Sequence, residues 1–150
     1  MGLFSKKIKM PNSKDLFWIE QNLEKLNYHN GCVNRTNNIE GFFNEITSIK
    51  SVVKDLIKYE NKYPDYFNPK PTEILKNFNK NNKLILEKNF IDRYLMAMER
   101  KLLDYSTMRG KTNNFNKMVD LFRYYAGEFE PENVKYFEMK LFEDFPEFYQ

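Results

Sequence analysis

The residue types that most often catalyse reactions or bind metals are scarce in this sequence. The only histidine is His29, and the only cysteine, Cys32, follows three positions later. Two such residues cannot complete a zinc site, which takes four nitrogen, sulfur or oxygen ligands. A serine or cysteine nucleophile needs a base within hydrogen-bonding distance, and His29 is the only histidine that could serve. The sequence therefore predicts no catalytic residue, no metal site and no cofactor, and a protein that is not an enzyme.

Carboxylate pairs and a phosphate-binding loop are the remaining catalytic alternatives. Glu138 lies one turn or more from Glu143 and Asp144 on an expected helix, so these carboxylates could share a face. Solvated acidic helices commonly carry such pairs. The sequence GKT at Gly110–Thr112 matches only the tail of a phosphate-binding loop, because the earlier glycine of that motif is missing. Neither pattern indicates a particular reaction.

Basic residues form one candidate binding surface, which would contact nucleic acid. Arg93 and Arg100 are seven positions apart on a strongly periodic segment, so they project from one helix face. Neighbouring tyrosines could stack on bases, whereas interleaved acids such as Glu99 dilute the positive charge. The candidate nucleic-acid contacts are Lys6, Lys7, Lys9, Arg93, Arg100 and Arg109.

Aromatic residues near the C-terminal end form the second candidate surface. Ten of them lie between positions 122 and 149, more than the buried faces of two helices require. Protein interfaces are enriched in aromatic anchors, and the acidic surroundings would suit a basic partner. The alternative is that these rings cover the end of a helical bundle. The candidate protein-interface residues are Tyr124, Tyr125, Phe129, Phe142, Phe148 and Tyr149.

These observations favour a protein-binding function over chemistry. We expect a non-enzymatic helical protein–protein interaction module, of the inhibitor, immunity or regulatory-partner type, whose partner is another protein or a second copy. A nucleic-acid-binding helical protein is the alternative. Nineteen asparagines and nineteen lysines suggest an AT-rich bacterial or phage genome. No apolar run approaches the roughly 18 residues that cross a bilayer, so the expected location is the cytoplasm, without membrane attachment.

Length and composition bound the architecture that holds these residues. The 150 residues include 41% hydrophobic and 17% aromatic side chains, enough for the core of one domain. Five glycines and six prolines are too few for the frequent turns of an all-β protein. Net charge is +7 over residues 1–111 and −4 over residues 112–150, which together give +3. We expect a flexible basic arm at residues 1–11 and one helical domain at residues 12–150.

Apolar residues at steps of three and four predict an all-α bundle of five main helices plus one short helix. The expected helices cover residues 12–30, 37–63, 72–78, 84–107, 112–126 and 131–145, with a break or kink at 79–83. Short polar side chains mark the expected starts, because they accept hydrogen bonds from the first backbone N–H groups. These are Asn12 or Ser13, Asn37, Thr72, and Thr112 or Asn113, whereas Pro131 opens the last helix and Gly31, Gly110 and Gly127 mark expected ends.

Overall fold

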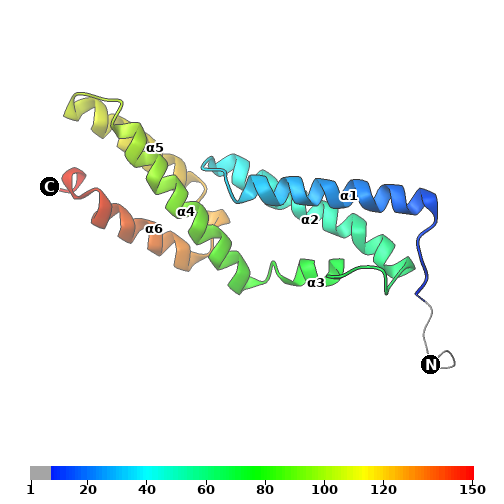
Figure 1. Cartoon of the computed structure of the whole chain (residues 1–150). Coiled ribbons are helices and arrows are strands. Elements are labelled where there is room, and N and C mark those ends of the chain that lie inside the picture. The colour runs from blue at the N-terminus through cyan, green and yellow to red at the C-terminus, as the bar shows by residue number, and fades with distance from the viewer. Residues whose placement is uncertain (1–7) are drawn as a thin grey trace. The chain divides into compact units, whose positions relative to one another are not determined.

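The structure, a computed structural model, describes residues 8–150 and is built from helices (Figure 1). In chain order they are α1 (Ser13–Val33), α2 (Ile39–Lys62), α3 (Pro71–Lys76), α4 (Lys80–Leu102), α5 (Met108–Tyr124) and α6 (Pro131–Asp144), with short 3-10 turns η2 (Ala126–Glu128) and η3 (Pro146–Phe148). Five helices are long, one is short, and no residue in the described range lies in a strand. The predicted all-α fold is confirmed.

Backbone contacts divide the chain into two compact units. The first consists of Met1–Val33 and Asn44–Asn79, and the second of Asn34–Phe43 and Lys80–Gln150. The start of α2 therefore belongs to the second unit and the rest of α2 to the first. A single domain over residues 12–150 stays a prediction, and the two units are described separately.

In the first unit, α1 and most of α2 bury an aliphatic core. Its fully or almost fully buried members include Ile19, Leu26, Ile49, Val53 and Leu56, whose spacing along each helix is the spacing of one face. Asp15 at the start of α1 joins the end of α2, because its carboxylate accepts hydrogen bonds from Lys62 at 2.8 Å and from the Tyr63 hydroxyl at 2.5 Å. These contacts fix α1 against the end of α2.

In the second unit, α4, α5 and α6 surround an aromatic core. Phe122 of α5 lies parallel to Phe137 of α6, with ring centroids 3.6 Å apart, and Phe129 stacks on Phe122 at 4.7 Å. Phe90 of α4 stacks on Phe42 at 4.4 Å, and all five of these rings are buried. Large buried rings supply much of the hydrophobic stabilisation of so small a unit.

Several predicted helix ends are wrong by a few residues. Gly31 lies inside α1 and Gly110 inside α5, and no described glycine has a positive φ, so none forms a left-handed cap. The long helix that was expected to reach residue 107 ends at Leu102. The predicted break at 79–83 falls at 77–79 instead, because α3 ends at Lys76 and residues 80–83 already belong to α4.

The helix starts were predicted unevenly, to within about one residue for α1, α2 and α6 only. Asn12 accepts the Asp15 N–H at 2.8 Å, as expected of a capping residue, and Pro131 is the first residue of α6. At α2 the cap is Asn38, one residue after the predicted Asn37. Thr72 does not cap α3; it binds the Glu60 carboxylate on α2 through its hydroxyl and its backbone N–H.

The start of α5 was also placed too late. Thr107 caps this helix, because its side chain accepts the N–H of Gly110, whereas the expected caps Thr112 and Asn113 lie within the helix.

No helix in residues 8–150 combines the length and hydropathy of a bilayer-spanning segment.

Candidate functional site

Three of the six predicted interface aromatics belong to the core of the second unit or pack against it. Phe129 is 4% exposed and packs on Phe122 and Phe43. Phe148 is half-buried and stacks on Phe115 of α5, with centroids 4.2 Å apart and ring planes within 7° of parallel. Tyr125 is half-buried, with its ring 6.1 Å from that of Phe43. These three rings stabilise the unit, and only Tyr125 and Phe148 keep some exposed surface.

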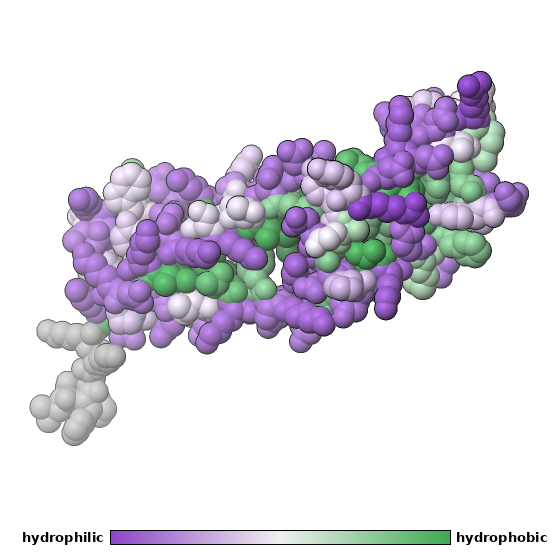
Figure 2. All heavy atoms as spheres, turned by 180° about the vertical axis from the view of Figure 1, so that it is seen from behind, coloured by the Kyte–Doolittle hydropathy of each residue, from purple (hydrophilic) through white to green (hydrophobic). Residues whose placement is uncertain are grey.

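The other three predicted interface residues are exposed. Tyr124 is 82%, Phe142 64% and Tyr149 43% exposed, and the Phe142 and Tyr149 rings contact each other with centroids 5.5 Å apart. Met139 lies one helical turn before Phe142 and is 51% exposed. We call Met139, Phe142 and Tyr149 the aromatic edge. On the face shown in Figure 2, hydrophobic residues reach the surface at the right-hand end, which belongs to the second unit.

The periodicity of α6 explains why Phe142 faces solvent. Phe137, Leu141 and Phe145 occupy the buried face, so the residue next to Leu141 is turned about 100° away from it, as the 3.6-residue repeat of the helix requires. On the side toward α5, Arg123 donates two hydrogen bonds of 2.9 Å to the Glu138 carboxylate. This hydrogen bond raises the pKa of Arg123. The two hydrogen bonds between Arg123 and Glu138 hold α6 against α5 and so orient the aromatic edge.

A groove with an apolar floor and a carboxylate rim runs between α4 and α6. It consists of two adjoining hollows of about 470 Å³ and 330 Å³, which share Glu99, Asp144 and Phe145. The apolar residues of the lining are Leu95, Met96, Leu102, Leu103, Phe145 and Phe148, and the charged residues are Asp92, Glu99, Lys111, Lys140, Asp144 and Glu147. We call this feature the acidic groove.

The carboxylates of the acidic groove differ in their partners. Asp92 accepts a hydrogen bond of 2.5 Å from the Tyr136 hydroxyl, and this bond raises the pKa of Tyr136 to about 12. Asp144 lies 3.8 Å from the Lys140 ammonium group. Glu99 and Glu147 are exposed and form no ion pair with any residue in the described range. Two carboxylates of the rim therefore keep their charge available to a partner.

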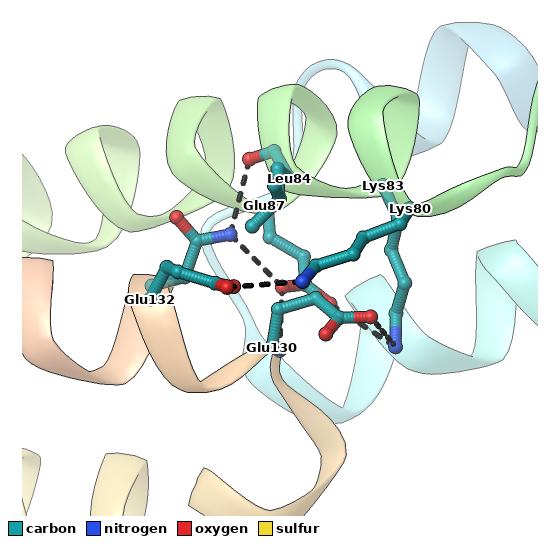
Figure 3. A network of polar contacts seen from close by, with 7 residues as sticks. Lys80, Lys83, Leu84, Glu87, Glu130 and Glu132 are labelled. Carbon is teal, nitrogen blue, oxygen red and sulfur yellow. Dashed lines mark hydrogen bonds and ion pairs between the residues drawn. The ribbon is translucent and has the colours of Figure 1, made fainter.

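A buried polar network fixes α6 against α4 (Figure 3). Glu87 of α4 is fully buried and accepts the backbone N–H of Glu130 at 2.9 Å and the side-chain amide of Asn133 at 3.0 Å. The Asn133 amide also donates to the Leu84 carbonyl at 3.0 Å, and Lys83 lies 3.6 Å from the second Glu87 oxygen. Near the surface, Lys80 pairs with Glu132 at 3.1 Å. The network holds the two walls of the acidic groove together at one end.

The predicted nucleic-acid contacts that the structure describes are divided between the two units, and each is described within its own unit. Arg93 is half-buried and donates to the Thr36 carbonyl at 2.8 Å, and its burial lowers its pKa. Arg100 and Arg109 are exposed. Lys9 lies over the Tyr63 ring, 5.4 Å from its centroid, in the first unit. Lys6 and Lys7 lie outside the described residues.

The other candidates for chemistry are engaged in ordinary structural contacts. His29 of α1 binds the Glu45 carboxylate of α2 at 2.5 Å, and Cys32 is a half-buried free thiol. In residues 8–150, no group of three or more histidine, cysteine, aspartate or glutamate side chains is arranged to hold a metal ion. The carboxylates that could form a catalytic pair have basic partners, Arg123 for Glu138 and Lys140 for Glu143 and Asp144.

An apolar hollow in the first unit was not predicted from the sequence. It measures about 590 Å³ and lies between α1 and the segment that follows α2. Leu23, Leu26, Phe67 and Ile74 form its apolar wall, and three asparagines line its polar side. The sequence of residues 63–71 indicates only an irregular crossing, because its prolines exclude a helix and give no information about what the crossing covers.

Comparison of the chain with protein-family models, with curated proteins and with solved structures finds no match. The function must therefore be inferred from the geometry. Of this candidate site, the sequence analysis named Phe142 and Tyr149, which are exposed, and did not name Met139, Glu99 or Glu147 as binding residues. Asp92 and Glu99, seven residues apart on α4, were the available signal, since this spacing puts both acids on the face that turns toward the acidic α6.

Proposed function

We propose that the chain is a non-enzymatic protein-binding module that contacts another protein through the aromatic edge of α6 and the adjacent acidic groove. An inhibitor, immunity or regulatory partner protein of a bacterium or phage, acting in the cytoplasm, fits this proposal. The observation that carries it is the exposed contact between the Phe142 and Tyr149 rings, which are 64% and 43% exposed. Two large rings held together in water gain free energy when a partner covers them.

Nucleic-acid binding remains the alternative because Arg100 and Arg109 are exposed. The contact between Arg93 and the Thr36 carbonyl disfavours it, since this guanidinium is already used within the unit. The acidic groove also lies on α4, the same helix, where it would repel phosphate. Nucleic-acid binding would weaken steeply with salt, and its absence at low salt would remove this alternative.

Site-specific photo-crosslinking tests the proposed function. A benzophenone amino acid at position 142 is expected to give one discrete protein adduct in cells that produce the chain. The matched position is Trp18, an aromatic residue of α1 that is 46% exposed. The double substitution Phe142→Ala with Tyr149→Ala should weaken the identified complex by about 30-fold, the effect of losing a hot spot of about 2 kcal/mol.

The control for this double substitution is Ile85→Ala on α4, which removes an equally exposed apolar side chain outside the aromatic edge. It should leave the affinity unchanged. Equal adducts from positions 142 and 18, or equal effects of the two sets of substitutions, would contradict a binding role for the aromatic edge.

A further inference from the structure

The residues that line the acidic groove indicate which kind of segment it can bind. Its floor holds the almost fully buried Leu95, Leu102 and Phe145, and at its margins Met96 is 53% and Leu103 76% exposed. An occupant with apolar side chains would cover both exposed residues. Four carboxylates and two ammonium groups line the groove, so its charge is negative and the occupant should be basic.

The chain itself contains a segment of this chemistry. Residues 1–8 read MGLFSKKI: they contain Lys6 and Lys7, four large apolar side chains in Met1, Leu3, Phe4 and Ile8, and no acid. The length also fits. The groove follows α4 from Asp92 to its end at Leu102, about 15 Å of helix, and five extended residues such as Phe4–Ile8 span about 17 Å.

We propose that the acidic groove binds residues 1–8 of a second copy of the chain. The apolar side chains cover Met96 and Leu103, while Lys6 and Lys7 lie against Glu99 and Glu147, the two exposed rim carboxylates without an ion pair among described residues. Two copies that exchange these segments fill both grooves and form a closed, twofold-symmetric dimer. This inference rests on the proposed function, since it names the partner and the contact that α6 makes.

The test reverses the charges of the acidic groove and of residues 1–8, first separately and then together. The molar mass and the dimer dissociation constant are measured by light scattering and sedimentation on the full chain, at low and high salt. The wild type should be a dimer at low salt that weakens as salt is added. Glu99→Lys with Glu147→Lys, and separately Lys6→Glu with Lys7→Glu, should each raise the dissociation constant at least about tenfold. The fourfold variant that combines both pairs should return to within about threefold of the wild type.

The matched control is Glu20→Lys with Glu24→Lys, which reverses two exposed acids on α1 and should leave the dissociation constant unchanged. Far-ultraviolet circular dichroism checks that each variant is as helical as the wild type. A wild type that is monomeric at every concentration, or a fourfold variant that stays as weak as its parents, overturns the inference.

The outcomes also separate this inference from the proposed function. A dimer that survives both charge reversals but dissociates with Phe142→Ala and Tyr149→Ala would overturn the role of residues 1–8 and retain the aromatic edge as the binding surface. A charge-dependent dimer that is unaffected at Phe142 and Tyr149 would support the groove contact and contradict the aromatic edge.

Discussion

At the scale of single residues, Glu87 shows how one buried carboxylate positions a helix. Its side chain lies at the N-terminal end of α6, where unpaired backbone N–H groups carry partial positive charge. It satisfies the Glu130 N–H and the Asn133 amide, and the Lys83 ammonium group balances its charge from 3.6 Å. The desolvation of the carboxylate is thus offset by partners from both helices.

Removing this carboxylate should destabilise the second unit. Glu87→Ala leaves the Glu130 N–H without its acceptor and the Asn133 amide with the Leu84 carbonyl alone, and should lower the free energy of unfolding by about 3 kcal/mol. Urea unfolding followed by circular dichroism measures the change. Glu99→Ala, an exposed acid on the same helix, is the control and should change stability by less than about 0.5 kcal/mol. Similar effects of both substitutions would show that the Glu87 network adds no stability.

Asp15 predicts a pH dependence in the first unit. Hydrogen bonds from Lys62 and Tyr63 lower the pKa of its carboxyl below the ordinary value of 3.8. The stability that these bonds contribute is therefore present above about pH 4 and is lost as the pH falls through the lowered pKa of the folded state. Unfolding measured between pH 5 and about pH 2 should show a shallower acid loss in Asp15→Asn than in the wild type. Glu20→Gln, an exposed acid on α1, should leave the acid profile unchanged.

The aromatic residues show what could be predicted at this scale. Phe129 and Phe142 have the same side chain and acidic neighbours in the sequence, yet Phe129 is 4% and Phe142 64% exposed. Helical spacing predicts that Phe142 is exposed, because the adjacent Leu141 already occupies the buried face of α6. Phe129 lies outside a regular helix, where no periodicity exists to assign its direction. Only the contact with Phe122, seven positions earlier, settles its role.

At the scale of elements, the hydrophobic repeats predict which helices exist but not where they end. Leu16 to Leu26 and Phe115 to Phe122 mark faces of α1 and α5, and both helices form. Gly31 and Gly110 were expected to end helices, yet both lie inside them. Glycine favours a helix end only when the chain must turn into the left-handed conformation. The tertiary contacts that decide whether it turns are not visible in the local sequence.

The cap of α5 is a separate prediction at this scale. Thr107 accepts the Gly110 N–H at 3.1 Å and satisfies one of the unpaired groups of the first turn. Thr107→Ala should lower the free energy of unfolding by about 1 kcal/mol, whereas Thr107→Asp should retain most of it. Ser106→Ala, at the exposed neighbouring position, should have almost no effect. Thermal unfolding of the three variants checks this order, and an equal loss at both positions would contradict the cap.

At the scale of the whole molecule, the structure shows where acids of the unevenly charged sequence lie. Among the acids of residues 112–150, Asp144 and Glu147 line the acidic groove, and α4 adds Asp92 and Glu99. The sequence could show the excess of acids but not the apolar floor between them, because that floor combines residues some 50 positions apart. The candidate site was therefore only half predictable, in its rings and not in its groove.

The two compact units lead to the last prediction, which concerns cooperativity. Trp18, the only tryptophan, reports on the first unit, whereas circular dichroism reports on the helices of both. Phe122→Ala removes a fully buried ring from the second unit and should cost about 3–5 kcal/mol. If the units unfold separately, this substitution shifts part of the circular dichroism transition in urea and leaves the Trp18 fluorescence midpoint unchanged. Leu56→Ala, at a fully buried position of the first unit, should do the reverse. Coincident shifts by both probes in both variants would instead establish one cooperative domain, because all-or-none unfolding makes every probe report the same transition.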